Sequence, residues 1–194
     1  NEANIALACK IADSDNREAI KELVENLSNK DRNIQSDCIK TLYETAYRKP
    51  ELLAEHVAVF LDLLKSKNNR MVWGTMIALS TLADLKHKEL FDALDLISET
   101  MQNGSVITID AGVEILSRLN TFPAYTDKVE PLLIEQLWKC PIKQLPQYAE
   151  KAVVSATKAN REIFSGLLLK RIPECTGDSQ RKRLEKVRKQ WDHV

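Results

Sequence analysis

Equivalent apolar positions recur at an interval of 37 residues along most of this chain. The segment Ile-Lys-Thr-Leu-Tyr-Glu-Thr-Ala at 39–46 is followed by Met-Ile-Ala-Leu-Ser-Thr-Leu-Ala at 76–83 and by Val-Glu-Ile-Leu-Ser-Arg-Leu-Asn at 113–120. Their central positions belong to the series Ile5, Leu42, Leu79, Leu116 and Val153. A period of this length is typical of repeated structural units that bury their apolar surface only by stacking.

A second apolar series lies between these segments. Ile20, Leu23 and Leu27 have the i, i+3, i+7 spacing of one helix face. The same spacing returns at the 37-residue interval, in the sets Val57, Phe60, Leu64 and Leu94, Ile97, Met101. Each repeat is therefore expected to contain a first and a second amphipathic helix. One such pair cannot cover its own apolar side, so neighbouring pairs must stack.

The pattern predicts an all-α chain, a right-handed α-solenoid of about five antiparallel helix pairs. First helices are expected near 2–12, 33–47, 70–85, 108–120 and 146–159. Second helices are expected near 17–28, 51–66, 88–102, 127–138 and 160–171. Residues 1–194 are interpreted as a single helical-repeat domain, with repeats near 1–30, 31–67, 68–104, 105–140 and 141–172 and a C-terminal capping helix at 178–192.

Residues at the expected helix boundaries agree with this division. Asp15 followed by Glu18 has the spacing of a capping box and predicts the start of a second helix. Pro50 suits the first turn of the next second helix. The segment 139–146 contains two prolines, so the last repeat is expected to be distorted.

The segments 31–42 (Asp-Arg-Asn-Ile-Gln-Ser-Asp-Cys-Ile-Lys-Thr-Leu) and 69–79 (Asn-Arg-Met-Val-Trp-Gly-Thr-Met-Ile-Ala-Leu) resemble the first helices of HEAT-type repeats. The chain thus resembles a HEAT/armadillo-like helical repeat protein over about residues 1–172. The resemblance implies a curved stack with the second helices on the inner surface. It concerns packing, so function has to be argued from the exposed residues.

Acidic residues occupy the side of the second helices that points away from the expected core. The 37-residue interval aligns them in two columns, Glu18, Glu55, Asp92 and Glu25, Asp62, Glu99. The column between them, Glu22, Val59 and Leu96, becomes apolar. This pattern predicts an acidic groove with an apolar middle that binds a basic segment of another protein. The alternative is that the acidic residues only solvate the exposed sides of the helices.

Basic residues gather at the C-terminus, where residues 158–194 carry 10 basic and 5 acidic side chains. The run consists of Arg181, Lys182, Arg183, Lys186, Arg188 and Lys189. One interpretation is a solvated end helix or a contact to a further repeat. The other is a phosphate-binding patch, although Trp191 has no companion aromatic row for base stacking.

The other large aromatic residues are interpreted as packing groups. Trp73 is expected beside the core of a first helix, and Tyr43 and Tyr47 are expected to pack on another first helix. Trp138 shares the repeat position of Met101 and is expected in the core.

No catalytic constellation is evident. His56, His87 and His193 are isolated, and neither a phosphate-binding glycine loop nor a zinc-ligand spacing occurs. We therefore expect a non-enzymatic protein-binding scaffold without metal or cofactor. One alternative is a DNA-binding helical-repeat protein of the alkylpurine glycosylase type, which needs a basic groove and aromatic residues for the base. Because the expected inner face is acidic, nucleic acid is not the expected partner. Another alternative is a structural segment of a larger repeat scaffold.

The cysteines and the hydropathy bear on the compartment. Cys9, Cys38, Cys140 and Cys175 are widely spaced and form no C-x-x-C motif, which indicates free thiols in a reducing compartment. No apolar run reaches the ~18 residues of a membrane span. A cytoplasmic protein is expected.

Overall fold

The computed structural model describes residues 2–194, which are helical with connecting turns and contain no strand. They form two compact units, unit 1 (Asn1–Gly112) and unit 2 (Val113–Val194). The boundary lies within helix α8 (Val106–Leu119). Each unit is described by itself below. The interpretation of residues 1–194 as one domain stays a prediction.

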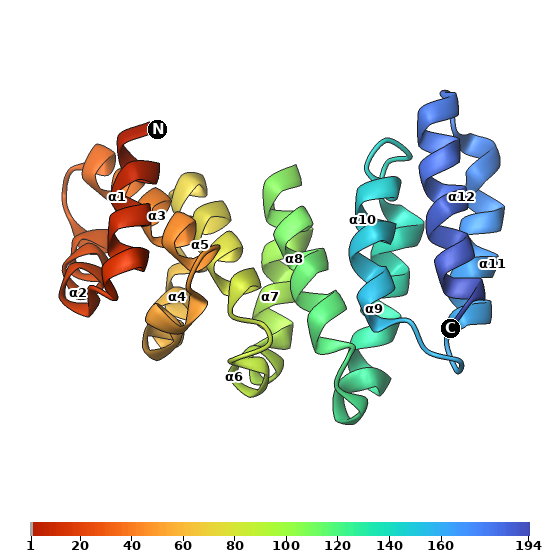
Figure 1. Ribbon diagram of the computed structural model, residues 1–194, viewed down its shortest axis with the longest axis horizontal. Helices are drawn as coiled ribbons and strands as arrows, with labels where there is room; N and C mark the ends of the chain where they lie inside the picture. The colour runs from red at the N-terminus through yellow and green to blue at the C-terminus, as the bar shows by residue number, and fades with distance from the viewer. Residues whose placement is uncertain (1) are drawn as a thin grey trace. The chain divides into compact units, whose positions relative to one another are not determined.

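Unit 1 alternates first and second helices as expected (Figure 1). The first helices are α1 (Glu2–Ser14), α3 (Arg32–Ala46) and α5 (Asn69–Thr81). The second helices are α2 (Arg17–Glu25), α4 (Val57–Leu63) and the pair α6 (His87–Asp92) and α7 (Leu94–Gln102). Their bounds confirm the predicted spacing, except that two of the second helices are interrupted.

The interruption falls at the same place in successive repeats. Short 3₁₀ turns at Pro50–Leu52 and Ala54–His56 precede α4, and helix α6 precedes α7. The continuous helices then begin at Val57 and Leu94, which are 37 residues apart. The breaks lie at His56 and Ala93, where the backbone departs from the α-helical conformation, with ψ of 8° and 15°.

Side-chain caps start helices α2, α3 and α5. The Asp31 and Asn68 side chains, 37 residues apart, accept hydrogen bonds from the backbone N–H of Asn33 (2.8 Å) and Arg70 (3.1 Å). The predicted cap of α2 is wrong by one residue: Asn16 accepts the bond from Ala19 N–H at 2.9 Å. Asp15 instead makes the turn, with a left-handed φ of 51° that Asp tolerates.

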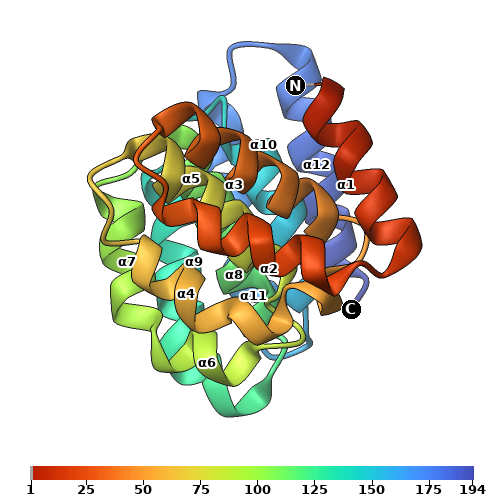
Figure 2. The same ribbon diagram turned by 90° about the vertical axis from the view of Figure 1, so that its left-hand side faces the viewer.

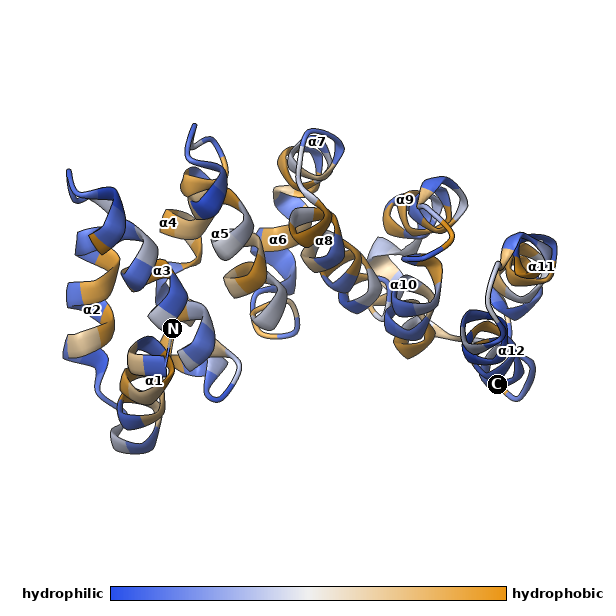
Figure 3. Cartoon of the chain, turned by 90° about the horizontal axis from the view of Figure 1, so that it is seen from above, coloured by the Kyte–Doolittle hydropathy of each residue, from blue (hydrophilic) through white to orange (hydrophobic). Residues whose placement is uncertain are grey.

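The core of unit 1 lies between the two rows of helices. Leu42 and Leu79 are fully buried, as their shared repeat position predicts. Helices α1, α3 and α5 pack side by side, with the most extensive contacts in the unit between α1 and α3 and between α3 and α5 (Figure 2). Gly74 permits this approach, because a Cβ atom there would lie 2.7 Å from Cγ1 of Ile39. Apolar residues, coloured orange in Figure 3, alternate with polar ones along these helices.

Unit 2 contains the end of α8 and four further helices. These are α9 (Thr126–Lys139), α10 (Leu145–Ala152), α11 (Arg161–Arg171) and α12 (Asp178–Asp192). Helix α10 is shorter than the predicted first helix at 146–159 and ends in a 3₁₀ turn at Val153–Ser155. Helix α12 packs on α10 and α11, and its Trp191 ring stacks on Phe164 with 4.3 Å between centroids.

A buried arginine links α9 to α11. Nη1 of Arg171 donates to the carbonyl oxygens of Leu137 (2.8 Å), Trp138 (2.9 Å) and Cys140 (2.9 Å). The rest of the guanidinium pairs with the Glu174 carboxylate at 2.7 Å, and this hydrogen bonding lowers the pKa of Glu174. The cation thus satisfies carbonyls that the C-terminus of α9 leaves without partners.

Candidate protein-binding surface

The acidic surface of unit 1 is formed by α2, α4, α6, α7 and the turns before α4. The predicted partner-binding residues on it are exposed, apart from the half-buried Leu96: Glu18, Glu22, Glu25, Glu55, Val59, Asp62, Asp92 and Glu99. Val59 is 41% exposed although it is aliphatic. The structure therefore leaves these side chains accessible, and their role in binding stays a prediction.

The negative charge of unit 1 lies on the second helices. Residues 50–64 carry three acidic and no Lys or Arg side chains, and residues 87–102 carry four acidic side chains and one lysine. The first helix α3, by contrast, has two of each sign, and α5 has a single arginine. A cationic ligand is therefore attracted to the second-helix side of the unit.

Two of the predicted partner-binding carboxylates are paired. Glu55 lies 3.4 Å from Arg17, and Asp62 lies 2.9 Å from Lys65. Both pairs are exposed to water, where an ion pair contributes little and a competing cation can replace it. For Asp92 and Glu99 no ion pair is described within residues 2–194.

Leu96 faces a neighbouring helix pair rather than open solvent. Together with Glu99 and Thr100 it lines a depression of about 460 Å³. The other lining residues come from the turn after α4, from α5 and from the turn after α7: Leu64, Lys65, Ser66, Lys67, Asn69, Val72, Asn103 and Gly104. The predicted apolar middle is thus, at Leu96, a depression between consecutive pairs that also contains two lysines.

Helix spacing bears on which row is the inner one. Helices on the inner side of a curved stack lie closer together than those on the outer side. Within unit 1 the close contacts join α1, α3 and α5, and none of comparable extent joins α2 to α4 or α4 to α7. Because α3 and α5 are also longer than α2 and α4, this difference shows that the first helices form the more extensively packed row, and the expected inner position of the second helices stays a prediction.

An aromatic cluster on the first helices was not recognised as a surface feature in the sequence. The Tyr43 ring lies 6.1 Å from the rings of both Tyr47 and Trp73, measured between centroids. Arg70 lies over the Trp73 ring at 5.8 Å and Lys40 over the Tyr43 ring at 4.6 Å. Packing is confirmed for the buried Tyr43 and for Trp73, which joins α5 to α3.

Two of the aromatics predicted as packing groups are exposed. Trp138 is 43% exposed, so its predicted core position is wrong. Tyr47 is 59% exposed, although its ring packs against Tyr43. Tyr47 follows the last residue of α3, and Trp138 lies near the end of α9, with the Lys170 ammonium 5.9 Å from its ring. Near a helix end a side chain has fewer neighbours to cover it, which the 37-residue interval does not encode.

The basic patch lies on α12, and all of its residues except the half-buried Arg188 are exposed. Two of its cations are engaged within the unit: Arg183 pairs with Glu150 of α10 at 2.7 Å, and Arg188 pairs with Asp192 at 2.6 Å. Arg181 lies 3.5 Å from Asp178. Exposed lysines complete the patch: Lys182, Lys186 and Lys189. Trp191 is fully buried, so it is not available for base stacking.

Among residues 2–194, no cluster of three or more His, Cys, Asp or Glu side chains with metal-binding geometry occurs. Among the same residues, no helix combines the length and the hydropathy needed to cross a bilayer.

Comparison with known proteins supports the fold. No family model matches the chain, and no curated protein sequence matches it. Among solved structures, a designed armadillo repeat protein in complex with the peptide (KR)4 aligns with a TM-score of 0.71 at 12% identity, over 95% of this chain and 85% of that one. A crystal structure of an engineered protein aligns with a TM-score of 0.66 at 19% identity, over 99% of this chain and 90% of that one.

These likenesses, together with the helical secondary structure, confirm the predicted fold class. The chain is an all-α protein with an armadillo-like helical-repeat fold of the α-solenoid class. Identities this low support the fold alone, so the binding role has to be argued from the surface.

Proposed function

We propose that this chain is a non-enzymatic scaffold that binds a basic segment of another protein on the acidic second-helix surface of unit 1. The observation that carries the proposal is the concentration of exposed carboxylates on α4, α6 and α7 and the turns before them. The likeness to a designed repeat protein that holds the peptide (KR)4 supports it.

Charge and exposure suggest how the ligand is held. Lysine and arginine side chains of the ligand pair with Glu55, Asp62, Asp92 and Glu99, and one of its apolar side chains contacts Val59. Helix α2 extends the surface with Glu18, Glu22 and Glu25. Exposed charges act mainly through attraction during association, so the affinity falls as the salt concentration rises.

The test is the binding of a fluorescein-labelled (KR)4 peptide, measured by fluorescence anisotropy at low and high salt. Glu55→Lys combined with Asp62→Lys is expected to weaken binding by more than about tenfold at low salt, a loss of about 1.4 kcal/mol. The matched control is Asp127→Lys combined with Glu162→Lys, which changes the net charge equally but alters exposed residues of unit 2. The control is expected to bind within about twofold of the parent.

Two results reject this surface. One is unchanged binding by the double variant of Glu55 and Asp62, with circular dichroism confirming its fold. The other is a loss of binding that follows Tyr47→Ala instead, because it assigns the ligand to the aromatic cluster of the first helices.

The competing functions make different predictions. A DNA glycosylase needs cationic residues along its groove, whereas α4 and the turns before it carry no Lys or Arg. Retention on a DNA column at moderate salt argues for that class, and flow-through argues for the scaffold. We place the scaffold in the cytoplasm, because its four cysteines are free thiols that suit a reducing compartment.

A further inference from the structure

The two units carry opposite net charges of equal size. Unit 1 has 13 basic and 18 acidic side chains, a balance of −5, and unit 2 has 15 basic and 10 acidic side chains, a balance of +5. The net charge of the chain is zero, so copies of it do not repel each other at long range. Each copy instead offers an acidic unit and a basic unit to its neighbours.

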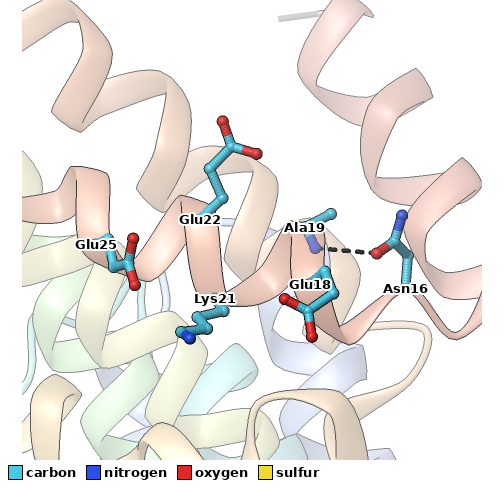
Figure 4. A pocket seen from close by; sticks show the side chains of 6 residues that line it. All are labelled: Asn16, Glu18, Ala19, Lys21, Glu22 and Glu25. Atoms are coloured by element: carbon cyan, nitrogen blue, oxygen red, sulfur yellow. Dashed lines mark hydrogen bonds between the residues drawn. The ribbon is translucent and has the colours of Figure 1, made fainter.

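The acidic end of unit 1 is the outer side of α2. Glu22 shares its repeat position with Leu96, and Leu96 lines the depression that α7 forms with the preceding helix pair. Glu22 therefore lies where a preceding pair would pack. A depression of about 380 Å³ is present there, lined by Asn16, Glu18, Ala19, Lys21, Glu22 and Glu25. Figure 4 shows Glu18 and Glu25 extending from the same side of α2, with Lys21 between them along the helix.

The basic end of unit 2 is formed by α11 and α12. A depression of about 390 Å³ lies there, lined by Arg161, Glu162, Ser165, Gly166, Leu169 and Asp192. Leu169 is 54% exposed, and Ile163, also on α11, is 52% exposed. Helix α12, which packs on α11, adds the exposed lysines Lys182, Lys186 and Lys189.

Gly166 supports contact with another molecule at this end. It lies in the middle of α11, where glycine is less stable than alanine. Nothing lies within 4 Å of the position that a Cβ atom would take, and its φ is not in the left-handed range, so the fold of unit 2 gives no reason for glycine. A glycine on an exposed helix face allows another backbone to approach closely.

We propose that copies of this chain associate head to tail, with α2 of one copy seated against α11 and α12 of a second copy. The carboxylates Glu18, Glu22 and Glu25 pair with Lys182, Lys186 and Lys189, and the small Ala19 lies against Leu169. A second copy is the occupant because both complementary ends belong to the same chain and are present at equal concentration. This contact shares the α2 carboxylates with the peptide surface proposed above, but it does not use the carboxylates of α4, α6 and α7.

The two ends differ, so the contact is heterologous, and a dimer keeps one free end of each kind. Such contacts extend into open chains or close into rings, and the assembly grows with protein concentration. The ion pairs at its rim weaken as salt screens them.

The test is analytical ultracentrifugation of the full chain over a concentration series, at low and high salt. The head variant carries Glu18→Gln, Glu22→Gln and Glu25→Gln, and the tail variant carries Lys182→Gln, Lys186→Gln and Lys189→Gln. The parent is expected to form dimers and larger species at low salt, and each variant alone is expected to remain monomeric. An equimolar mixture is expected to form dimers and nothing larger, because only one intact pair of ends remains.

Controls separate this contact from the peptide site. Glu51→Gln, Asp95→Asn and Asp127→Asn remove the same number of exposed charges elsewhere and are expected to leave association unchanged. A neutralising variant of the peptide site, Glu55→Gln with Asp62→Asn, is also expected to associate like the parent. A parent that stays monomeric at low salt overturns the proposal. So does association of either variant by itself, or a mixture that remains monomeric.

Discussion

Replacing Arg171 by leucine removes the side chain that hydrogen-bonds the end of α9 to α11. Leucine keeps the helix propensity of position 171 and most of its apolar contact, but it donates no hydrogen bond. Three carbonyl oxygens, those of Leu137, Trp138 and Cys140, then lose a charged donor. The Glu174 carboxylate stays exposed to water and is hydrated after the change.

The expected loss follows from the carbonyls. Each buried acceptor left without a donor costs about 1 kcal/mol or more, so three of them predict a loss of about 3 kcal/mol in the free energy of unfolding. Arg171→Lys is expected to recover only part of this, because an ammonium lacks the planar fork that reaches the carbonyls and Glu174 together.

Urea unfolding, followed by circular dichroism and by tryptophan fluorescence, measures this loss. Trp138 and Trp191 report on unit 2, whereas Trp73 reports on unit 1. An Arg171→Leu protein whose unfolding free energy stays within about 0.5 kcal/mol of the parent contradicts the reasoning, because it means that water satisfies these carbonyls equally well.

Three further changes test the packing. Gly74→Ala places a methyl group 2.7 Å from Cγ1 of Ile39 and is expected to lower the thermal midpoint, with a strain cost of about 1–3 kcal/mol. Gly166→Ala meets open space and is expected to raise stability by about 0.5–1 kcal/mol; a lower midpoint contradicts the assignment of Gly166 to an open surface. Hydrogen bonding from Arg183 lowers the pKa of Glu150. The pair therefore stabilises the fold fully at pH values above the ordinary carboxyl pKa, and this stabilisation is lost as the pH falls through the lowered pKa of Glu150. The difference in midpoint between the parent and Glu150→Gln is therefore expected at pH 7 and lost in acid; a difference that persists after the carboxyl is protonated contradicts the pairing.

The fold was predictable because the core repeats. Leu42 and Leu79 are buried alike, and a strict interval between such residues is sufficient to define helix pairs without knowledge of their neighbours. The interval did not predict the break before Val57 and Leu94, because a helix and a pair of short helical segments can place the same apolar face toward the core. Local backbone geometry decides between them.

The surface was less predictable than the core. Charged side chains such as Glu55 and Asp62 are exposed in almost any fold, so their accessibility followed from residue type alone. The sequence could not show that Leu96 faces the preceding pair or that α1, α3 and α5 form the more closely packed row. These properties depend on the angle between helices, which side-chain volumes and contacts such as Gly74 against Ile39 determine.

The short segments before α4 and α7 turn the chain from one row to the other and still contribute to the interior. Leu52, Leu53 and Leu90 lie in them and are buried. Insertions within these segments would therefore displace core side chains. The exposed turns ahead of them, at Arg48 and Leu85, are the natural places at which to graft a loop while keeping the repeat intact.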